Sequence, residues 1–180
     1  MTAAAVKTLV FDTTCLSHFA RSERLDVLGS LVVDQDCWTT SVVTEELHVG
    51  MASHPVLAAA LKLDWLSVTQ LDSADEIACF GKWIRWVCTG DRDRGEASVF
   101  AAAELLGGVA ITDDRQALRF GRRHGATVHG TVWLLAWACR DGRLTETAAG
   151  NLIDALIGTG HRLPCTGSEF SSYARRRHLL

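Results

Sequence analysis

Proline is scarce in this sequence, and linkers, repeats and low-complexity stretches are absent. Only Pro55 and Pro164 occur among the 180 residues, and no glycine- or serine-rich segment interrupts the chain. A chain of this length folds as one domain around one hydrophobic core. We therefore expect a globular domain without an internal boundary.

Long hydrophobic runs are also missing. The longest nearly apolar stretch, residues 132–139, is far shorter than the roughly 20 residues that cross a bilayer as a helix. Residues 1–11 contain one lysine and lack the apolar segment of a signal peptide. These absences predict a cytoplasmic protein that does not associate with a membrane.

Cysteine and histidine spacings typical of zinc or redox motifs do not occur. No two cysteines lie two to four residues apart, and there is no His-Glu-x-x-His sequence. We expect the cysteines to be reduced and mostly buried. They are Cys15, Cys37, Cys79, Cys88, Cys139 and Cys165.

A large excess of charge of either sign is lacking too. The formal net charge is −3, and 22% of the residues are charged while 48% are hydrophobic. This composition excludes intrinsic disorder, and it excludes a protein that coats nucleic acid through overall positive charge. A local basic patch remains compatible with it.

What the sequence does contain is an alternation of short β-branched runs with longer segments of helical period. This alternation predicts an α/β fold, in which helices cover a mostly parallel sheet of about five strands. The expected strands are 8–11, 37–39, 66–68, 109–112 and 127–128. The expected helices are 14–20, 24–31, 42–50, 55–61, 74–87, 96–106, 115–124, 132–140 and 146–157.

Acidic residues follow two expected strands and lie near the start of two expected helices. Asp12 directly follows the first strand, and Asp113 and Asp114 follow the fourth. Glu46 lies about one turn into its helix, whereas Glu96 opens the next long one. Because helices in a parallel α/β sheet begin near the carboxyl ends of strands, we expect these carboxylates at one edge, where ligands bind.

Crowded carboxylates repel one another unless some protonate, basic groups pair with them or a cation binds. Oxygen ligands without a nearby histidine or thiolate suit Mg²⁺ or Mn²⁺ rather than Zn²⁺. Each acid also has a structural explanation: Asp12 and Asp114 as helix caps, Glu96 as a partner of the helix dipole, and Glu46 as a solvated residue. Together the four exceed what capping requires, so we expect a divalent-metal site.

The order of these acids and their neighbours resembles the PIN-domain ribonucleases, in particular the VapC-like toxin nucleases of bacterial toxin–antitoxin pairs. The matching segments are Asp12-Thr13-Thr14, Glu46-Leu47, Gly95-Glu96-Ala97 and Thr112-Asp113-Asp114-Arg115. The third acid of that family is most often aspartate, and the Gly-Glu-Ala form resembles a subgroup of PIN-like proteins. The doublets Glu45-Glu46 and Asp113-Asp114 leave a choice of one residue each, and the local frame favours the second of each pair.

The resemblance implies a three-layer α/β/α nuclease domain over residues 1–166 and a basic tail over 167–180. It implies a metal-dependent endoribonuclease that cleaves single-stranded or structured RNA, with Asp12, Glu46, Glu96 and Asp114 as catalytic residues. Mg²⁺ or Mn²⁺ is expected at Asp12, Glu96, Asp113 and Asp114. A small antitoxin protein is the implied partner.

Positive charge follows the last acid. Arg115, Arg119 and Arg122 recur at helical spacing, and guanidinium groups suit phosphate oxygens. Thr14 is a further candidate, either as a hydrogen-bond partner of the substrate site or as a helix cap. We take these four as candidate substrate-binding residues, although a solvated helix face explains the arginines equally well.

Tryptophans form two local groups. Trp83 and Trp86 lie beside basic residues, where they could stack unpaired bases or receive a partner, although at least one should lie in the core. Trp133 and Trp137 lie four residues apart. We expect that pair to pack internally or to form a homodimer surface.

Two other functions remain open. A haloacid-dehalogenase-like phosphohydrolase also has an aspartate after its first strand, but that family requires Asp-x-Asp where this chain has Thr14, and neither Lys62 nor Lys82 is well placed. A non-catalytic PIN-like binding module, whose acids serve only as caps, is the second alternative. A metal-binding titration distinguishes that module from the nuclease.

Overall fold

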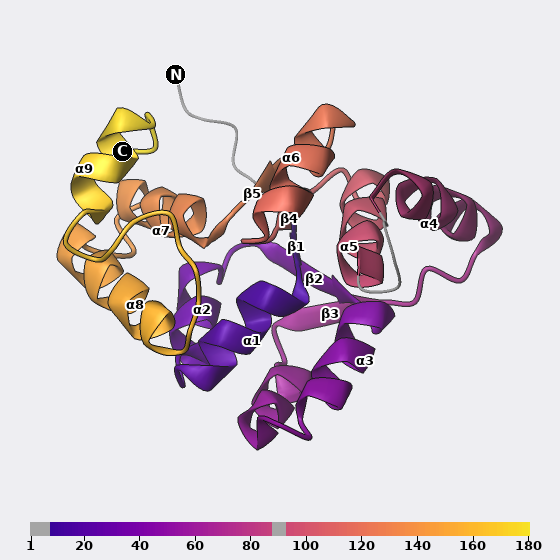
Figure 1. Ribbon diagram of the computed structural model, residues 1–180, viewed down its shortest axis with the longest axis horizontal. Helices are drawn as coiled ribbons and strands as arrows, with labels where there is room; N and C mark the ends of the chain where they lie inside the picture. The colour runs from indigo at the N-terminus through magenta and orange to yellow at the C-terminus, as the bar shows by residue number, and fades with distance from the viewer. Residues whose placement is uncertain (1–7, 88–92) are drawn as a thin grey trace.

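The computed structural model describes residues 8–87 and 93–180, which form a five-stranded parallel sheet flanked by helices (Figure 1). The strands are β1 (Thr8–Phe11), β2 (Asp36–Thr40), β3 (Leu66–Thr69), β4 (Val109–Ile111) and β5 (Val128–His129). Their order across the sheet is β3-β2-β1-β4-β5, and every neighbouring pair is parallel. The predicted three-layer α/β/α architecture is confirmed.

Helices connect the strands and continue beyond the last one. The first group is α1 (Thr13–Arg21), α2 (Leu25–Leu31), α3 (Ser41–Gly50) and the 3-10 helix η1 (Pro55–Lys62). The second is α4 (Ala74–Val87), α5 (Arg94–Leu105) and α6 (Arg115–Arg123), and the third is α7 (Thr131–Arg140), α8 (Glu146–Gly158) and α9 (Phe170–Arg176). The helix expected over 55–61 therefore forms with 3-10 geometry, and α9 was not expected.

The chain reverses its direction across the sheet between β3 and β4. The connections from β1 to β2 and from β2 to β3 run towards one edge, whereas the next connection returns past β1 to β4. Right-handed crossovers therefore place α1 to α3 on one face and α4 to α6 on the other (Figure 1). The carboxyl ends of β1 and β4 consequently flank the position at which parallel α/β sheets bind ligands.

The two central strands are buried on both faces, because helices cover each of them. Leu9, Val10 and Phe11 of β1 have no exposed surface, and neither do Ala110 and Ile111 of β4. Helix α5, whose buried face is rich in alanine, packs directly on β1, β2 and β4. Small side chains allow this close approach, which fixes the start of α5 near the ends of the strands.

The described cysteines are free thiols, as expected. Cys15, Cys37, Cys79 and Cys165 are buried and Cys139 is half-buried, whereas Cys88 lies outside the described residues. No helix within residues 8–87 and 93–180 is long and apolar enough to cross a bilayer.

The basic segment expected over residues 167–180 is attached to the domain through α9. This helix packs on α7 and α8, and its Phe170 and Ala174 have no exposed surface. Arg175 pairs with Glu146 of α8 at 2.6 Å. The last helix thus lies against the domain, with its arginines at the surface.

Candidate active site

Asp12 directly follows β1, at the end of the strand that lies beside β4. Its backbone N–H donates to the carbonyl of Ile111 at 3.0 Å, so the ends of the two strands are joined. The side chain caps α1 and is 2% exposed. Its Oδ2 accepts from the Thr112 hydroxyl at 2.9 Å and from the Thr14 N–H at 3.4 Å. Thr14, a candidate substrate-binding residue, therefore serves as part of the helix cap.

Burial raises the pKa of Asp12 above its usual range, because a buried carboxylate loses its hydration, while the hydrogen bonds from Thr112 and Thr14 partly offset this effect. No lysine or arginine forms an ion pair with Asp12 within the part of the chain that the structure describes. Asp12 is thus a buried acid whose orientation is fixed but whose charge is not neutralised.

Glu46 reaches the same edge from α3. Its carboxylate accepts from the Thr13 hydroxyl and lies against the backbone of Gly95. A Cβ atom at position 95 would come within 2.5 Å of Glu46 Oε2, so only glycine leaves room for this carboxylate. Burial, and to a lesser extent the charge of Asp12, raise the pKa of Glu46. Glu45, the alternative in the doublet, is exposed to solvent.

Glu96 lies in the first turn of α5, where the charges of the other three acids act on its carboxylate. Burial raises its pKa to about 8, and repulsion from Asp12, Glu46 and Asp114 adds to the effect. Asp114 caps α6, and its Oδ1 accepts from the N–H groups of Gln116 and Ala117, both at 2.8 Å. A small cavity of about 60 Å³ lies between Glu96 and Asp114.

The four acids form a group of oxygen donors, which is the donor chemistry that Mg²⁺ and Mn²⁺ prefer. Within the described residues, no three His, Cys, Asp or Glu side chains converge tightly enough to enclose a metal ion. Asp12, Glu46 and Asp114 nevertheless lie near enough to Glu96 for their charges to add to the effect of burial on its pKa. The site therefore fits a hard divalent cation by its donor type and its uncompensated charge.

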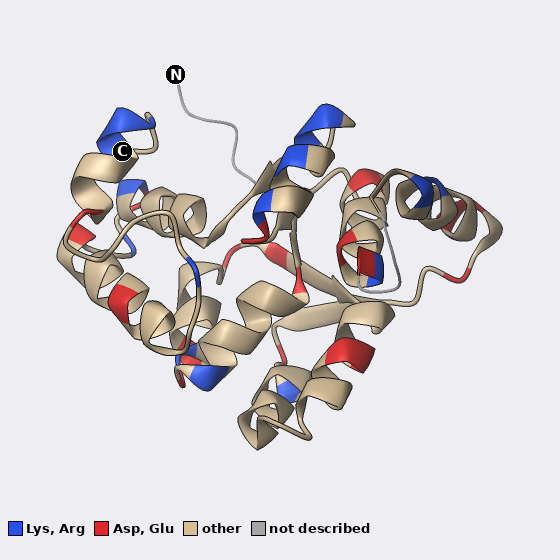
Figure 2. Ribbon diagram, viewed as in Figure 1, with Lys and Arg blue, Asp and Glu red and all other residues tan. Residues whose placement is uncertain are grey.

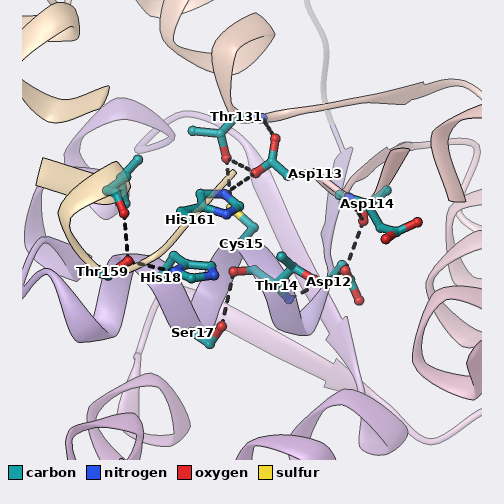
Figure 3. A network of polar contacts seen from close by, with 12 residues as sticks. Asp12, Thr14, Cys15, Ser17, His18, Asp113, Asp114, Thr131, Thr159 and His161 are labelled. Atoms are coloured by element: carbon teal, nitrogen blue, oxygen red, sulfur yellow. Dashed lines mark hydrogen bonds and ion pairs between the residues drawn. The ribbon is translucent and has the colours of Figure 1, made fainter. Parts of the chain in front are cut away.

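Asp113 points away from this group, although it precedes Asp114 directly (Figure 3). Its Oδ1 accepts from the N–H of Thr131 at 2.7 Å, and its Oδ2 accepts from the Thr131 hydroxyl at 2.6 Å and from His161 Nε2 at 2.9 Å. The side chain of Asp113 is 5% exposed and that of His161 is 4% exposed. The structure therefore separates Asp113, expected among the metal ligands, from Asp12, Glu96 and Asp114.

A partly buried polar network continues from Asp113 on the side of the sheet away from Glu96. The ring of His18 stacks on that of His161, with 3.9 Å between centroids, and His18 Nδ1 contacts the Thr159 hydroxyl at 2.6 Å (Figure 3). Burial and the neighbouring His161 lower the pKa of His18 to about 4. No local motif identifies these residues, because they come from segments far apart in the sequence.

The candidate substrate-binding arginines divide between two sides of α6. Arg115 and Arg122 line a cavity of about 360 Å³ that also reaches α7 and α9, whereas Arg119 lies with Phe120 on the outer side. Trp83 is buried in the core and Trp86 is 39% exposed, as expected for a pair of which at least one packs internally.

The pKa of Glu96 leads to a prediction about stability. Between the pKa of an unfolded glutamate and about 8, the folded chain retains a proton that the unfolded chain has lost, so the free energy of unfolding falls as pH rises. Glu96→Gln removes this effect. In chelator, we expect the variant to melt a few degrees higher than the parent at about pH 8 and equally at about pH 5. A lower Tm of the variant at about pH 8 would contradict the conclusion that ionised Glu96 destabilises the folded protein.

The comparison with known families agrees with this geometry. Residues 8–168 match the model of the DUF3368 family of PIN domains, so the chain belongs to this family. No curated protein matches the chain. PIN domains are generally nucleases that use divalent metal ions, which accords with an acidic site at the carboxyl edge of the sheet. The predicted PIN-domain membership is confirmed.

Proposed function

We propose that this protein is a Mg²⁺- or Mn²⁺-dependent endoribonuclease. The observation that carries the proposal is the group Asp12, Glu46 and Glu96, whose pKa values are all raised and which form no ion pair with a basic side chain within the described residues. Buried charges are normally paired, because their dehydration is costly. A divalent cation supplies the missing partner and is the cofactor that PIN domains generally use.

In this proposal Asp12, Glu96 and Asp114 hold the metal, and Glu46 completes or orients the ligand group. A cation held by these residues would lower the pKa of water and neutralise negative charge on the phosphodiester. Thr112 and the Thr14 N–H fix the direction of the Asp12 carboxylate. The N–H groups of α6 bind Oδ1 of Asp114, and its Oδ2 accepts no hydrogen bond within the described residues.

The substrate is proposed to be RNA, single-stranded or locally structured. The arginines of α6 begin directly after Asp114, so positive charge adjoins the acids where phosphates would arrive (Figure 2). The four-part motif that resembles VapC-like toxins further supports the role of a toxin with a small antitoxin partner. A homodimer is proposed as well, and the half-buried Trp137, whose ring is parallel to that of Trp133 with centroids 6.4 Å apart, is the candidate for its surface.

The family match disfavours the phosphohydrolase alternative. Lys82 is also remote from the acids, because it pairs with Glu104 at 2.5 Å in a cavity at the amino ends of β4 and β5. The non-catalytic module remains the second candidate, since Asp12 and Asp114 do cap helices. Metal binding separates the two.

Metal addition should stabilise the folded protein. A cation that binds only the folded acid group stabilises it by about 2.7 kcal/mol at a hundredfold excess over its Kd, which corresponds to a rise of roughly 5–10 °C in Tm. We expect this rise with millimolar Mn²⁺ or Mg²⁺ in differential scanning fluorimetry, and cleavage of single-stranded RNA that chelator stops. An unchanged Tm without cleavage would favour the non-catalytic module. Hydrolysis of a phosphomonoester but not of RNA would favour the phosphohydrolase.

A growth experiment tests the toxin role separately. Expression of the chain in bacteria should slow growth, and Asp12→Asn should abolish the effect. A gene for a small protein directly beside this one is the expected genomic context. RNA cleavage in vitro without an effect on growth would leave the nuclease proposal standing and contradict the toxin proposal.

A further inference from the structure

A basic cavity of about 360 Å³ lies at the carboxyl edge of the sheet, beside the acids. Asp113 and Gly130, which follow β4 and β5, line its floor, and residues of α6, α7 and the C-terminal helix line its walls. Its volume is within the range of about 300–1,000 Å³ typical of small-ligand sites. The cavity is therefore large enough for one nucleotide and adjoins the proposed scissile position through Arg115.

Four arginines from three separate segments converge on this cavity. They are Arg115 and Arg122 of α6, Arg162 after α8, and Arg177 at the end of α9. None of the four forms an ion pair with a described carboxylate. Figure 2 shows the concentration of blue on α6 and at the end of α9. All four residues are exposed to solvent, so their unpaired charges are available to an anionic ligand.

The acid in the cavity does not neutralise these arginines. Asp113 is 5% exposed and already accepts three hydrogen bonds from Thr131 and His161. Two other cavities differ from it: one of about 430 Å³ holds Lys82 paired with Glu104, and one of about 380 Å³ is lined by residues of α6 alone, among them Arg119 and Arg123. The convergence of unpaired arginines from three separate segments therefore distinguishes the cavity beside the acids.

Aromatic rings supply a second kind of surface. Trp133 lines the cavity with its ring stacked on His129, at 4.1 Å between centroids, and Tyr173 lines it from α9. The Arg177 guanidinium lies 5.6 Å from the centre of the Tyr173 ring. Alternation of guanidinium groups with flat rings is how proteins hold the phosphates and bases of single-stranded nucleic acid.

We infer that this cavity binds a nucleotide of single-stranded RNA next to the cleavage site, with backbone phosphates on Arg122 and Arg177 and a base against the Tyr173 ring. The inference rests on the proposed ribonuclease function and extends it to the C-terminal helix. Tyr173 and Arg177 lie beyond residue 168, where the PIN-domain match ends. Helix α9 is therefore part of the substrate surface as well as of the core.

Binding in chelator tests the inference without cleavage. The probe is a fluorescein-labelled single-stranded oligoribonucleotide of about 12 nucleotides, which falls within the site sizes of such proteins. Arg122→Ala/Arg177→Ala should weaken binding at least about tenfold at low salt and reduce the slope of log K against log salt by about 1.4, since each lost contact accounts for about 0.7. Tyr173→Leu should weaken binding at every salt concentration and leave the slope unchanged.

The matched control is Arg123→Ala/Arg176→Ala, which removes the same charge from neighbouring exposed positions of the same helices and leaves the cavity intact. It should bind within about threefold of the parent. Equal losses in the two double variants would overturn the inference, since general surface charge would then explain binding. Preference for a poly-glutamate peptide over RNA would also overturn it, in favour of an acidic protein partner.

A cleavage assay distinguishes failure of the proposed binding site from failure of the proposed ribonuclease function. RNA that binds through the cavity but is not cut with Mn²⁺ would overturn the proposed ribonuclease and leave the binding site standing. Cleavage by Arg122→Ala/Arg177→Ala with an unchanged KM would overturn the binding site and leave the proposed ribonuclease standing. Failure of the parent to bind RNA at low salt would overturn the cavity assignment.

Discussion

Asp12→Asn should abolish metal-dependent RNA cleavage while leaving the protein folded. Asparagine keeps an oxygen that can accept from Thr112 and from the Thr14 N–H, and it caps a helix as well as aspartate does. It removes the charge that would hold the metal, whose contribution to the transition state is several kcal/mol. We expect at least about a hundredfold loss of cleavage rate, because each 1.36 kcal/mol changes the rate tenfold.

The control for this variant is Asp36→Asn. Asp36 is the exposed first residue of β2, so the same change is made at the opposite edge of the sheet. Its cleavage rate should equal that of the parent. Because burial raises the pKa of Asp12, the metal-free Asp12→Asn protein should also melt no lower than the parent. Cleavage that survives Asp12→Asn, or persists in excess chelator, would contradict the mechanism.

The fold could be predicted because its local signals agree with one another. Short β-branched runs such as residues 8–11 and 109–111 are buried on both faces and cannot be mistaken for surface helices. Once the strands are known to be parallel, Asp12 and Asp114 must share an edge, since each follows a strand. The order of helices and strands along the sequence is therefore enough to predict that these two acids lie at the same edge of the sheet.

Contacts between distant segments could not be predicted in this way. Nothing in the sequence around Gly95 shows that Glu46, 49 positions earlier, occupies the space a Cβ would need. The cavity beside α6 depends equally on long-range packing, because Arg162 lines it from the segment after α8 and Arg177 from the end of α9, which packs on α7 and α8. Helical spacing alone grouped Arg119 with Arg115 and Arg122, whereas the structure places it on the outer side of α6.

Mutation of the adjacent aspartates Asp113 and Asp114 should have different main effects, on stability for Asp113 and on RNA cleavage for Asp114. Asp113→Ala leaves the buried Thr131 N–H, the Thr131 hydroxyl and the His161 ring without their acceptor. Each buried donor left without its acceptor costs about 1–3 kcal/mol, so Tm should fall by on the order of 10 °C. Thermal unfolding in chelator measures this loss without any contribution from metal.

Asp114→Ala is the matched variant for this prediction. Asp114 is exposed and loses only its bonds to the N–H groups of α6, which corresponds to about 1 kcal/mol and a Tm decrease of roughly 2–4 °C. Its RNA cleavage should nevertheless fall as far as that of Asp12→Asn, because a metal-holding carboxylate is lost. If Asp114→Ala cleaves RNA normally while Asp113→Asn, which keeps one acceptor and much of the fold, does not, the assignment of the two aspartates must be exchanged.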